Sequence, residues 1–287
     1  MAHVLVLTAA AGVSDATAAG AARALGGEAR RLAASAVEIA FDGAVPDGLE
    51  VPGCDANLVP LAGRRKRLLV ADMDSTIIGV ECIDELADFA GLKAEVAAIT
   101  EAAMKGELDF EAALVARVGL LRDLPASVLE ECYAERVRLN PGARTLVATM
   151  AALGAETALV SGGFTFFSER VAREAGFARH QANTLLVKDG RLTGEVGRPI
   201  LGRRAKLAAL HAIASEIGVR AEAALAVGDG ANDADMVRAA GLGVAYHARP
   251  ALAAVADARI DYSDLTALLA LQGIPEAEWR DHATARA

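Results

Sequence analysis

The sequence predicts an α/β fold in which helices cover both faces of a parallel sheet. Four short apolar runs end at Ala71, Val160, Val227 and Tyr246, and helical stretches separate them. Strands that alternate with helices in this way form parallel sheets. The chain of 287 residues is 54% apolar but only 4% aromatic, which is typical of a helix-rich enzyme with a core of small side chains. Its length allows two domains, or one domain with insertions.

The first 63 residues are expected to form a small α/β unit. Strands are predicted at Val4–Leu7 and Ala36–Phe41, with an alanine-rich helix at Ser14–Leu25 between them. A stretch punctuated by proline and glycine, from Ala44 to Gly63, then leads into the main part of the chain.

The segment that follows the first strand of the main part is predicted to be helical. Ile83, Leu86, Ala87 and Ala90 recur at helical spacing and give one apolar face. Several such helices, inserted between the first strand and the next, are expected to form a mobile cap over the carboxyl ends of the strands. The predicted divisions are therefore an N-terminal unit at residues 1–63 and a main domain at residues 64–287, with a core at 67–80 and 140–275 and a cap at about 81–139.

The same patterns predict the later elements. Helices are expected at Thr165–Ala175 and Arg203–Ile217. A hairpin is expected at Thr184–Val196, because a Lys-Asp-Gly-Arg turn lies at its centre. The polar tail from Glu276 to Ala287 is expected to form a loose terminal helix.

Two carboxylates stand at the end of the first strand of the core. Asp72 and Asp74, in the sequence DMDST, directly follow the apolar run Leu68–Ala71. Strand residues i and i+2 project to the same side, so both carboxylates point into the crevice where open α/β sheets hold ligands. Converging carboxylates repel unless a cation lies between them, and Mg²⁺ prefers such hard oxygen ligands. A strand-end turn with a helix-capping hydroxyl is the alternative, and an isolated Asp-x-Asp would favour it.

Two further segments indicate a site for a phosphate group. After the strand that ends at Val160, the sequence continues with Ser161, Gly162 and Gly163, and a helix is predicted to follow. Glycines allow backbone N–H groups to approach a phosphate closely, and a helix N-terminus adds positive dipole character. Lys206, at the start of the next predicted helix, could offset negative charge, although most lysines are solvated surface residues.

A last acidic segment follows the third strand of the core. In VGDGANDADM, Asp229, Asn232 and Asp233 come within five residues, and Asp235 follows. Acids at a helix start gain only modestly from the helix dipole, whereas a bound divalent cation would relieve their repulsion. Together the four segments predict a Mg²⁺ and phosphate site.

Composition and charge exclude several other classes. The net charge of −9 argues against a nucleic-acid partner, which requires a basic surface. No stretch approaches the ~20 apolar residues of a membrane span, and the chain start lacks the charged region of a signal peptide. Cys54, Cys82 and Cys132 have no metal-ligand spacing and are expected to be reduced, as in a cytoplasmic protein.

In this order, the four segments resemble the haloacid dehalogenase superfamily of aspartate-nucleophile phosphatases. The longer stretches DMDSTIIGVECIDELAD, MKGELDFEAALVARVGLLRDLP and VGDGANDADM resemble the phosphoserine phosphatase family within it. The resemblance runs from about Arg67 to Leu271 and implies a Rossmann-like core with a helical cap. Enzymes of this family often carry an ACT-like regulatory module before the core, which the N-terminal unit resembles loosely. An extension that only covers apolar surface is an equal alternative.

The resemblance implies a role for each residue of the site. Asp72 would be the nucleophile, and Asp74 the general acid and base. Mg²⁺ would be held by the carboxylate of Asp72, the backbone carbonyl of Asp74 and the carboxylate of Asp229, with Asp233 in support. The phosphoryl group would be bound by Ser161, Gly162, Lys206 and Asn232.

The resemblance also implies a substrate pocket in the cap. Glu81 would bind the ammonium group of phosphoserine, and Arg117 would bind its carboxylate through a bidentate fork. Met104 and Phe110 would close over the substrate. Without the resemblance, these four residues would be interpreted as exposed helix charges and packing residues of the cap.

The predicted activity is the Mg²⁺-dependent hydrolysis of O-phospho-L-serine, the last step of serine biosynthesis, through an aspartyl-phosphate intermediate. A phosphatase or phosphotransferase for a related amino-alcohol phosphate, such as phosphothreonine or phosphohomoserine, is an alternative, because a methyl or methylene group is worth only ~1–3 kcal/mol in a pocket. A non-catalytic amino-acid sensor is a second alternative, which the full set of carboxylates and Lys206 disfavours. The expected partner is a small-molecule substrate, with a homodimer also considered and no nucleic acid or membrane.

Overall fold

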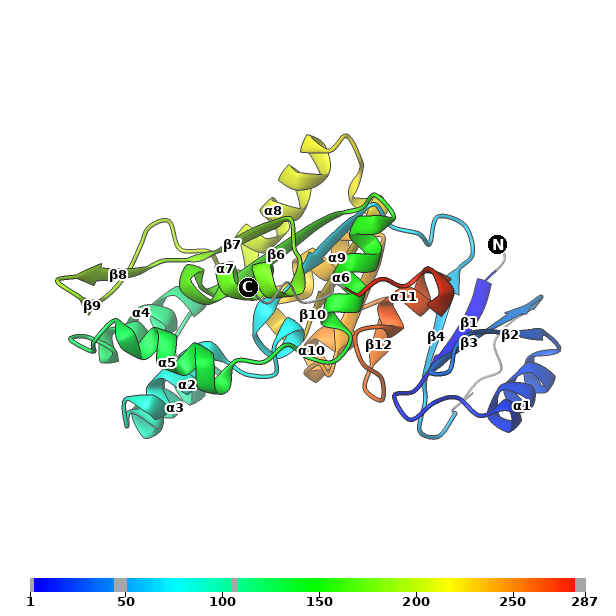
Figure 1. Cartoon of the computed structure of the whole chain (residues 1–287), viewed down its shortest axis with the longest axis horizontal. Coiled ribbons are helices and arrows are strands. Elements are labelled where there is room, and N and C mark those ends of the chain that lie inside the picture. The colour runs from blue at the N-terminus through cyan, green and yellow to red at the C-terminus, as the bar shows by residue number, and fades with distance from the viewer. Residues whose placement is uncertain (1–2, 44–50, 105–107, 282–287) are drawn as a thin grey trace.

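Six parallel strands form the main sheet of the protein, in the order β12-β11-β10-β5-β6-β7 (Figure 1). The computed structural model describes residues 3–43, 51–104 and 108–281, apart from the side chains of residues 102–104. The central strands are apolar throughout because both of their faces are covered, and the predicted parallel sheet is confirmed. The strands are β5 (Leu68–Ala71), β6 (Glu156–Phe164), β7 (Arg179–Asn183), β10 (Ala224–Gly228), β11 (Leu242–Tyr246) and β12 (Ala258–Ile260).

Helices pack on both faces of this sheet. In β5, Leu68 and Val70 face one helical layer, and Leu69 and Ala71 face the other, as the alternation of a strand requires. The first layer consists of α8 (Arg203–Glu216), α9 (Ala234–Ala239) and α10 (Pro250–Ala253). The second layer consists of α6 (Ala143–Ala152), α7 (Thr165–Ala175) and α11 (Ala267–Leu271).

The cap consists of helices inserted between β5 and β6, as predicted. In the first of them, Ile83, Leu86 and Ala87 are buried, whereas Ala90 ends the helix half-buried. The cap helices are α2 (Cys82–Phe89), α3 (Lys93–Met104), α4 (Phe110–Leu120) and α5 (Ser127–Arg136).

The predicted hairpin is present and extends the cap. It consists of β8 (Leu185–Lys188) and β9 (Arg191–Val196), and both residues of its turn, Asp189 and Gly190, have positive φ angles. The backbone N–H of Leu192 donates to the carbonyl of Leu124 at 2.9 Å, and the N–H of Ala126 donates to the carbonyl of Gly190 at 2.8 Å. A segment between β7 and α8 is therefore bonded to the loop between α4 and α5 (Figure 1).

The N-terminal unit is a four-stranded antiparallel sheet with one described helix. Its strand order is β2-β3-β1-β4. One face packs on α1, and the other contributes Val4, Val6 and Val59 to the apolar cluster that contains α11. Because every residue of α11 is buried, this helix joins the unit to the core. The elements are β1 (His3–Thr8), α1 (Asp15–Leu25), β2 (Glu28–Ala33), β3 (Ala36–Phe41) and β4 (Asp55–Pro60).

Polar contacts complete the junction between this unit and the core. The carboxylate of Asp55 accepts hydrogen bonds from the backbone N–H groups of Asp261 (2.6 Å) and Tyr262 (3.0 Å). The side-chain amide of Asn57 bonds both the N–H and the carbonyl of Arg259 in β12, at 2.8 and 2.9 Å. These side chains thus satisfy backbone groups at the edge of the main sheet.

Four strands were not predicted from the sequence. β2 and β7 are rich in polar residues, and β12 has only three residues. β4 lies in the segment from Ala44 to Gly63, for which the sequence predicts no strand. Its buried positions include Asp55 and Asn57, whereas its exposed positions hold Ala56, Leu58 and Pro60, so the usual alternation of a strand is reversed. Residues 44–50 lie outside the described part.

Two other expectations need correction. The strand that is expected to end at Val160 continues as β6 to Phe164 and so includes Gly162 and Gly163, whereas α7 begins at Thr165, as predicted. In the tail, a single helical turn at Glu276–Glu278 is followed by extended backbone at Trp279, and residues 282–287 lie outside the description. Short helical turns also occur at Met73–Ile77, Ala221–Ala223 and Ala231–Asp233.

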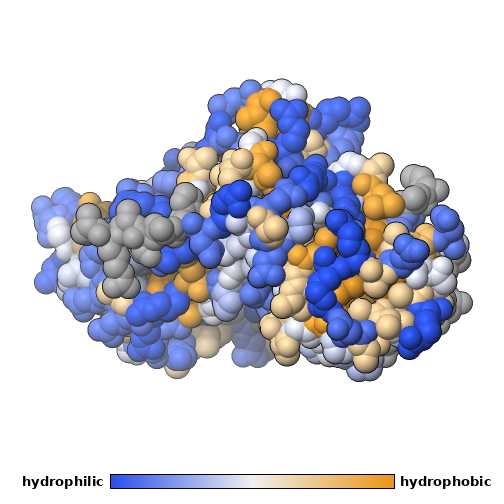
Figure 2. Space-filling model, turned by 45° about the vertical axis from the view of Figure 1, so that its right-hand side comes forward, coloured by the Kyte–Doolittle hydropathy of each residue, from blue (hydrophilic) through white to orange (hydrophobic). Residues whose placement is uncertain are grey.

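On the face drawn in Figure 2, hydrophilic residues predominate, and apolar residues lie in groups between them. Among the residues described, no helix is both long enough and apolar enough to cross a membrane.

Candidate active site

The chain turns sharply where β5 ends. The carboxylate of Asp72 accepts a hydrogen bond from the N–H of Met73 at 2.7 Å, and a tight turn follows at Met73–Ile77. Ser75 in this turn has a φ angle of 54°, a left-handed conformation that is uncommon outside glycine. The turn reverses the backbone directly after Asp72 and leaves both Asp72 and Asp74 buried at the strand end.

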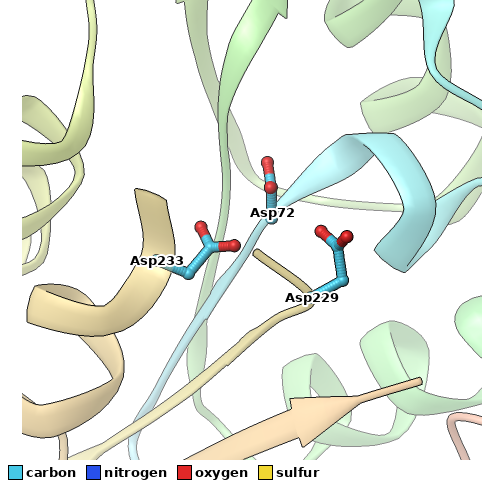
Figure 3. A group of neighbouring side chains, drawn as sticks. All are labelled: Asp72, Asp229 and Asp233. Atoms are coloured by element: carbon cyan, nitrogen blue, oxygen red, sulfur yellow. The ribbon is translucent and has the colours of Figure 1, made fainter. Parts of the chain in front are cut away.

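Three carboxylates converge at the carboxyl ends of β5 and β10. Asp72, Asp229 and Asp233 face a common space (Figure 3), and each has an oxygen within 4.8 Å of the others. Asp229 follows β10, and Asp233 stands at the start of α9. Close approach is possible because Gly228 has no side chain, since a Cβ there would overlap the carboxyl of Asp233.

Lys206 lies behind this group and bridges two of its members. Its Nζ lies 2.7 Å from Asp72 Oδ2 and 2.6 Å from Asp233 Oδ1. Burial opposes the charged ammonium, but the two carboxylates outweigh burial and raise the pKa of Lys206, so the amine stays protonated. Three carboxylates against one ammonium leave two negative charges, the complement of a divalent cation.

The pKa values of the carboxylates reflect this excess of negative charge. Burial, followed by the charge of Asp233, raises the pKa of Asp72 well above its usual value. Burial and the same neighbour raise the pKa of Asp229 to about 6. Oxygen ligands in such a group suit Mg²⁺, so the residues present fit the metal that the sequence predicts.

Asp74 is held separately from the three carboxylates. One oxygen accepts a hydrogen bond from the backbone N–H of Cys82 at 3.0 Å, and the other accepts one from the hydroxyl of Ser161 at 3.2 Å. Burial raises the pKa of Asp74 above its usual value, against the effect of these hydrogen bonds. A raised pKa suits a group that must donate and accept a proton.

The serine and glycines after Val160 form a bulge at the end of β6. Val160 pairs with Gln181 and Phe164 pairs with Asn183, so β6 advances four residues while β7 advances two. The N–H of Gly163 donates to Ser161 Oγ at 2.8 Å. A Cβ on Gly163 would stand 2.5 Å from Asp74 Oδ2, so the bulge can approach Asp74 only with glycine there.

A cavity of about 470 Å³ opens over these groups, between the core and the cap. It brings together eight of the residues predicted from the sequence. These are Asp72, Asp74, Glu81, Phe110, Arg117, Gly162, Asp229 and Asn232. Ser161, Lys206 and Asp233 lie directly behind its wall, bonded to Asp74 or Asp72 or to each other. Met104 ends α3, and its side chain lies outside the described residues.

Glu81 lies between the turn at Met73–Ile77 and α2, the first helix of the cap. Its carboxylate accepts a hydrogen bond from the hydroxyl of Ser75 at 2.7 Å. The residue as a whole is exposed, but its carboxyl group lines the cavity. Desolvation of that group, with the nearby charge of Asp74, raises the pKa of Glu81 to about 7. A positively charged ligand group would relieve this and favour the carboxylate form.

Sequence reasoning missed several residues of the site. Arg203 and Arg249 line the cavity, and Cys82, expected only to pack in its helix, also donates its N–H to Asp74. Arg249 follows the end of β11 by three residues, so a search of all strand ends would have found it. Arg203 precedes Lys206 by one helical turn, a weaker signal.

Comparisons with known proteins agree with this geometry. A sequence model of the haloacid dehalogenase-like hydrolases matches residues 69–238. Phosphoserine phosphatase SerB2 from Mycobacterium tuberculosis is 49% identical over 218 residues, which are 76% of this chain and 53% of the relative. A phosphoserine phosphatase from Polaromonas sp. is 46% identical over 210 residues, 71% of this chain and 89% of the relative.

A solved structure matches nearly the whole chain. The unliganded crystal structure of a probable phosphoserine phosphatase from Vibrio cholerae has a TM-score of 0.81 and 33% identity, covering 96% of this chain and 88% of that one. The N-terminal unit is therefore largely included in the match. The chain spans about half the length of the first two curated relatives that it matches.

Proposed function

This chain belongs to the haloacid dehalogenase-like hydrolases, and from that premise we propose that it hydrolyses O-phospho-L-serine to L-serine and phosphate. One observation carries the choice of substrate: Glu81 and Arg117 line the same cavity as Asp72 and Gly162. The cavity thus offers a carboxylate, a guanidinium group and a phosphate loop, which complement the ammonium, carboxylate and phosphate of phosphoserine. The names of the relatives support the same substrate.

In the proposed reaction, Asp72 attacks phosphorus and Asp74 gives its proton to the departing serine oxygen. The bond from phosphorus to that oxygen breaks, and the phosphoryl group is carried by Asp72. Asp74, now ionised, takes a proton from a water molecule that attacks the same phosphorus, and the bond between phosphorus and the Asp72 oxygen breaks, which releases phosphate and restores the Asp72 carboxylate. The raised pKa of Asp74 supports its first role, and its hydrogen bonds to Cys82 and Ser161 hold it in place.

The phosphoryl oxygens carry negative charge that must be offset before a carboxylate can attack. We propose that the ammonium of Lys206, which contacts Asp72, and the backbone of the bulge at Gly162, which lines the cavity, offset this charge. Asn232 lines the cavity beside them. We propose that Mg²⁺ is held by the carboxylates of Asp72 and Asp229 and by the backbone carbonyl of Asp74, with Asp233 in support. The ion would neutralise phosphate oxygens as a Lewis acid.

A phosphate-release assay tests the function directly. We expect phosphoserine to be hydrolysed in the presence of Mg²⁺, with a higher kcat/KM than phosphothreonine, phosphohomoserine or p-nitrophenyl phosphate. A higher kcat/KM for one of the other amino-alcohol phosphates would reassign the substrate. No turnover of any ester would favour an amino-acid sensor.

The remaining predictions concern the protein as a whole. We propose that residues 64–287 are the phosphatase domain, with its cap at about 81–139, and that residues 1–63 are a separate unit. The single described helix on the sheet of that unit leaves its resemblance to an ACT-like module a prediction. A cytoplasmic location and a homodimer are also still predictions.

A further inference from the structure

Asn183 connects three segments at the edge of the candidate site. It is the last residue of β7, and only 2% of its surface is exposed. Its side-chain Nδ2 donates to the carbonyl of Gly162 at 2.8 Å and to that of Leu201 at 3.1 Å. Its Oδ1 accepts from the N–H of Leu201 at 2.7 Å. The whole amide group is thus used by backbone partners.

The bulge in β6 explains why Gly162 needs such a partner. Regular pairing between β6 and β7 stops at Val160 and resumes at Phe164, so the residues between leave the ladder. A buried carbonyl without a partner costs free energy. The amide of Asn183 reaches across the interruption and takes the place of the missing strand contact.

This bond also sets the direction of the peptide between Gly162 and Gly163. Its carbonyl points to Asn183, and its N–H points to Ser161 Oγ, 2.8 Å away. Ser161 Oγ in turn lies 3.2 Å from Asp74 Oδ2. Because a peptide group is planar, fixing the carbonyl on one side fixes the N–H on the side of the active site.

The second partner, Leu201, leads into the helix that carries Lys206. Only Gly202 separates Leu201 from the first residue of α8. The two hydrogen bonds to Leu201 therefore hold the entry to α8 next to the bulge. One side chain links the backbone that faces the phosphate with the helix that supplies the ammonium.

We propose that Asn183 is a positioning residue, which fixes the backbone of Ser161–Gly163 and the start of α8 so that both face the phosphoryl group. The proposal rests on the proposed function only in taking this end of the cavity as the phosphate end. Asn183 does not line the cavity and would act through Gly162 and Leu201. Replacing it should therefore weaken the binding of phosphate and leave the binding of the amino-acid end of the substrate unchanged.

Two variants and a matched control test this role in the full-length protein with Mg²⁺ present. Asn183→Asp keeps an acceptor for the N–H of Leu201 but loses both N–H donors. Asn183→Ser adds no charge, but its side chain is too short to bond Gly162 and Leu201. Gln181→Glu makes the same amide-to-acid change at an exposed residue of the same strand. Calorimetry would give the affinities for inorganic phosphate and for L-serine, and a thermal melt would give the folded range of each variant.

We expect both Asn183 variants to bind inorganic phosphate roughly tenfold more weakly, as for a lost buried hydrogen bond of about 1.4 kcal/mol. Their affinity for L-serine and all properties of Gln181→Glu should match the wild type. The kcat/KM values for phosphoserine and p-nitrophenyl phosphate should fall by the same factor.

Unchanged phosphate affinity at a temperature where the variants are folded would overturn the proposal, whatever the loss in melting temperature. Equal losses for phosphate and L-serine would overturn it too, since they would indicate general damage to the site. If phosphoserine proved not to be a substrate, the proposed function would fail, while the phosphate measurement would still decide the role of Asn183.

Discussion

The ring of Phe110 in the cap lies directly against Gly162 in the core: a Cβ on Gly162 would stand 3.1 Å from Phe110 Cζ. The same ring lies 3.1 Å from the position of a Cβ on Gly202. Phe110 thus packs between the bulge of β6 and the start of α8. The closeness of the cap to the core depends on the absence of two side chains.

Gly162→Ala should therefore weaken catalysis by holding the cap away from the core. A methyl group at this distance forces Phe110 to shift, and overpacking of this kind costs ~1–3 kcal/mol. We expect kcat/KM to fall roughly 5- to 100-fold, and the added variant Phe110→Leu should restore part of it. Gly20→Ala is the control, because a Cβ there has no atom within 4 Å. Full activity of Gly162→Ala would show that Phe110 and the cap accommodate the added methyl group without loss.

Asp72→Asn should abolish turnover without unfolding the protein. An amide cannot form the acyl phosphate, so kcat should fall by several decades. Asp74→Asn should also lose most turnover, since no group would remain to protonate the serine oxygen. Thermal melts would confirm that both variants are folded. If Asp72→Asn retained more than about a hundredth of the wild-type kcat, the covalent mechanism would be wrong.

Removing metal should abolish activity and lower stability. Mg²⁺ at 100 times its Kd should raise the melting temperature by about 5–10 °C, because binding at that excess contributes ~2.7 kcal/mol. Asp229→Asn should lose most of this rise, whereas the exposed carboxylate variant Asp15→Asn should keep it. Ca²⁺ should bind but inhibit, since it accepts more ligands at longer distances. Full activity after dialysis against EDTA would exclude a metal requirement.

Arg117→Ala should lose activity toward phosphoserine selectively. The substrate carboxylate would be left without its partner in the cavity, at a cost of ~2–5 kcal/mol, so kcat/KM should fall by roughly two decades or more. Hydrolysis of p-nitrophenyl phosphate, which has no carboxylate, should change little. Glu81→Gln should show the same selectivity, and Arg173→Ala, an exposed arginine of α7, serves as the control. Parallel losses for both substrates would instead place these residues in the catalytic machinery or in cap folding.

Asp55→Ala should destabilise the junction between the N-terminal unit and the core. The N–H groups of Asp261 and Tyr262 would lose their charged acceptor, and a hydrogen bond to a charged group contributes ~1.5–3 kcal/mol. We expect the free energy of unfolding in urea to fall by about 2 kcal/mol or more. Asp55→Asn keeps one acceptor oxygen and should lose less. Equal stability of Asp55→Ala and wild type would show that apolar packing on α11 holds the unit without these bonds.

The sequence predicts the catalytic end of the fold better than its edges, for a physical reason. β5 and β10 are buried on both faces, so their apolar runs and the acids that follow them are visible in the sequence. β7 lies at the edge of the main sheet and is mostly polar, so its pattern resembles a loop. Edge strands are therefore the elements that sequence patterns miss.

The residues of the site divide in the same way. Asp72, Asp74 and Asp229 stand at strand ends, where the parallel sheet itself places them together. Asn183 and Cys82 contact the site through hydrogen bonds to partners that lie 21 and 8 residues away in sequence. Nothing in the local pattern around an asparagine at the end of a polar strand indicates that its partner lies 21 residues away.

The bonds between the hairpin and the cap have a consequence for movement. The two chain segments that enter and leave the cap helices are bonded to each other, since Asn140 joins Ile77 and Thr76 through its backbone and side chain. The two that enter and leave the hairpin are joined by Asn183 and Leu201. Cap and hairpin are thus bonded into one unit, here called the lid, which joins the core through two pairs of chain segments.

We expect a lid that is attached to the core at two places to move as one body, by rotation about the line that joins the two attachments. Spin labels at the exposed Val115 in α4 and Val187 in the hairpin should therefore keep their mutual distance while both move relative to the core. For the same reason, a lid transferred from a relative would need both the cap helices and the hairpin, because either one alone would lack one of the two attachments to the core.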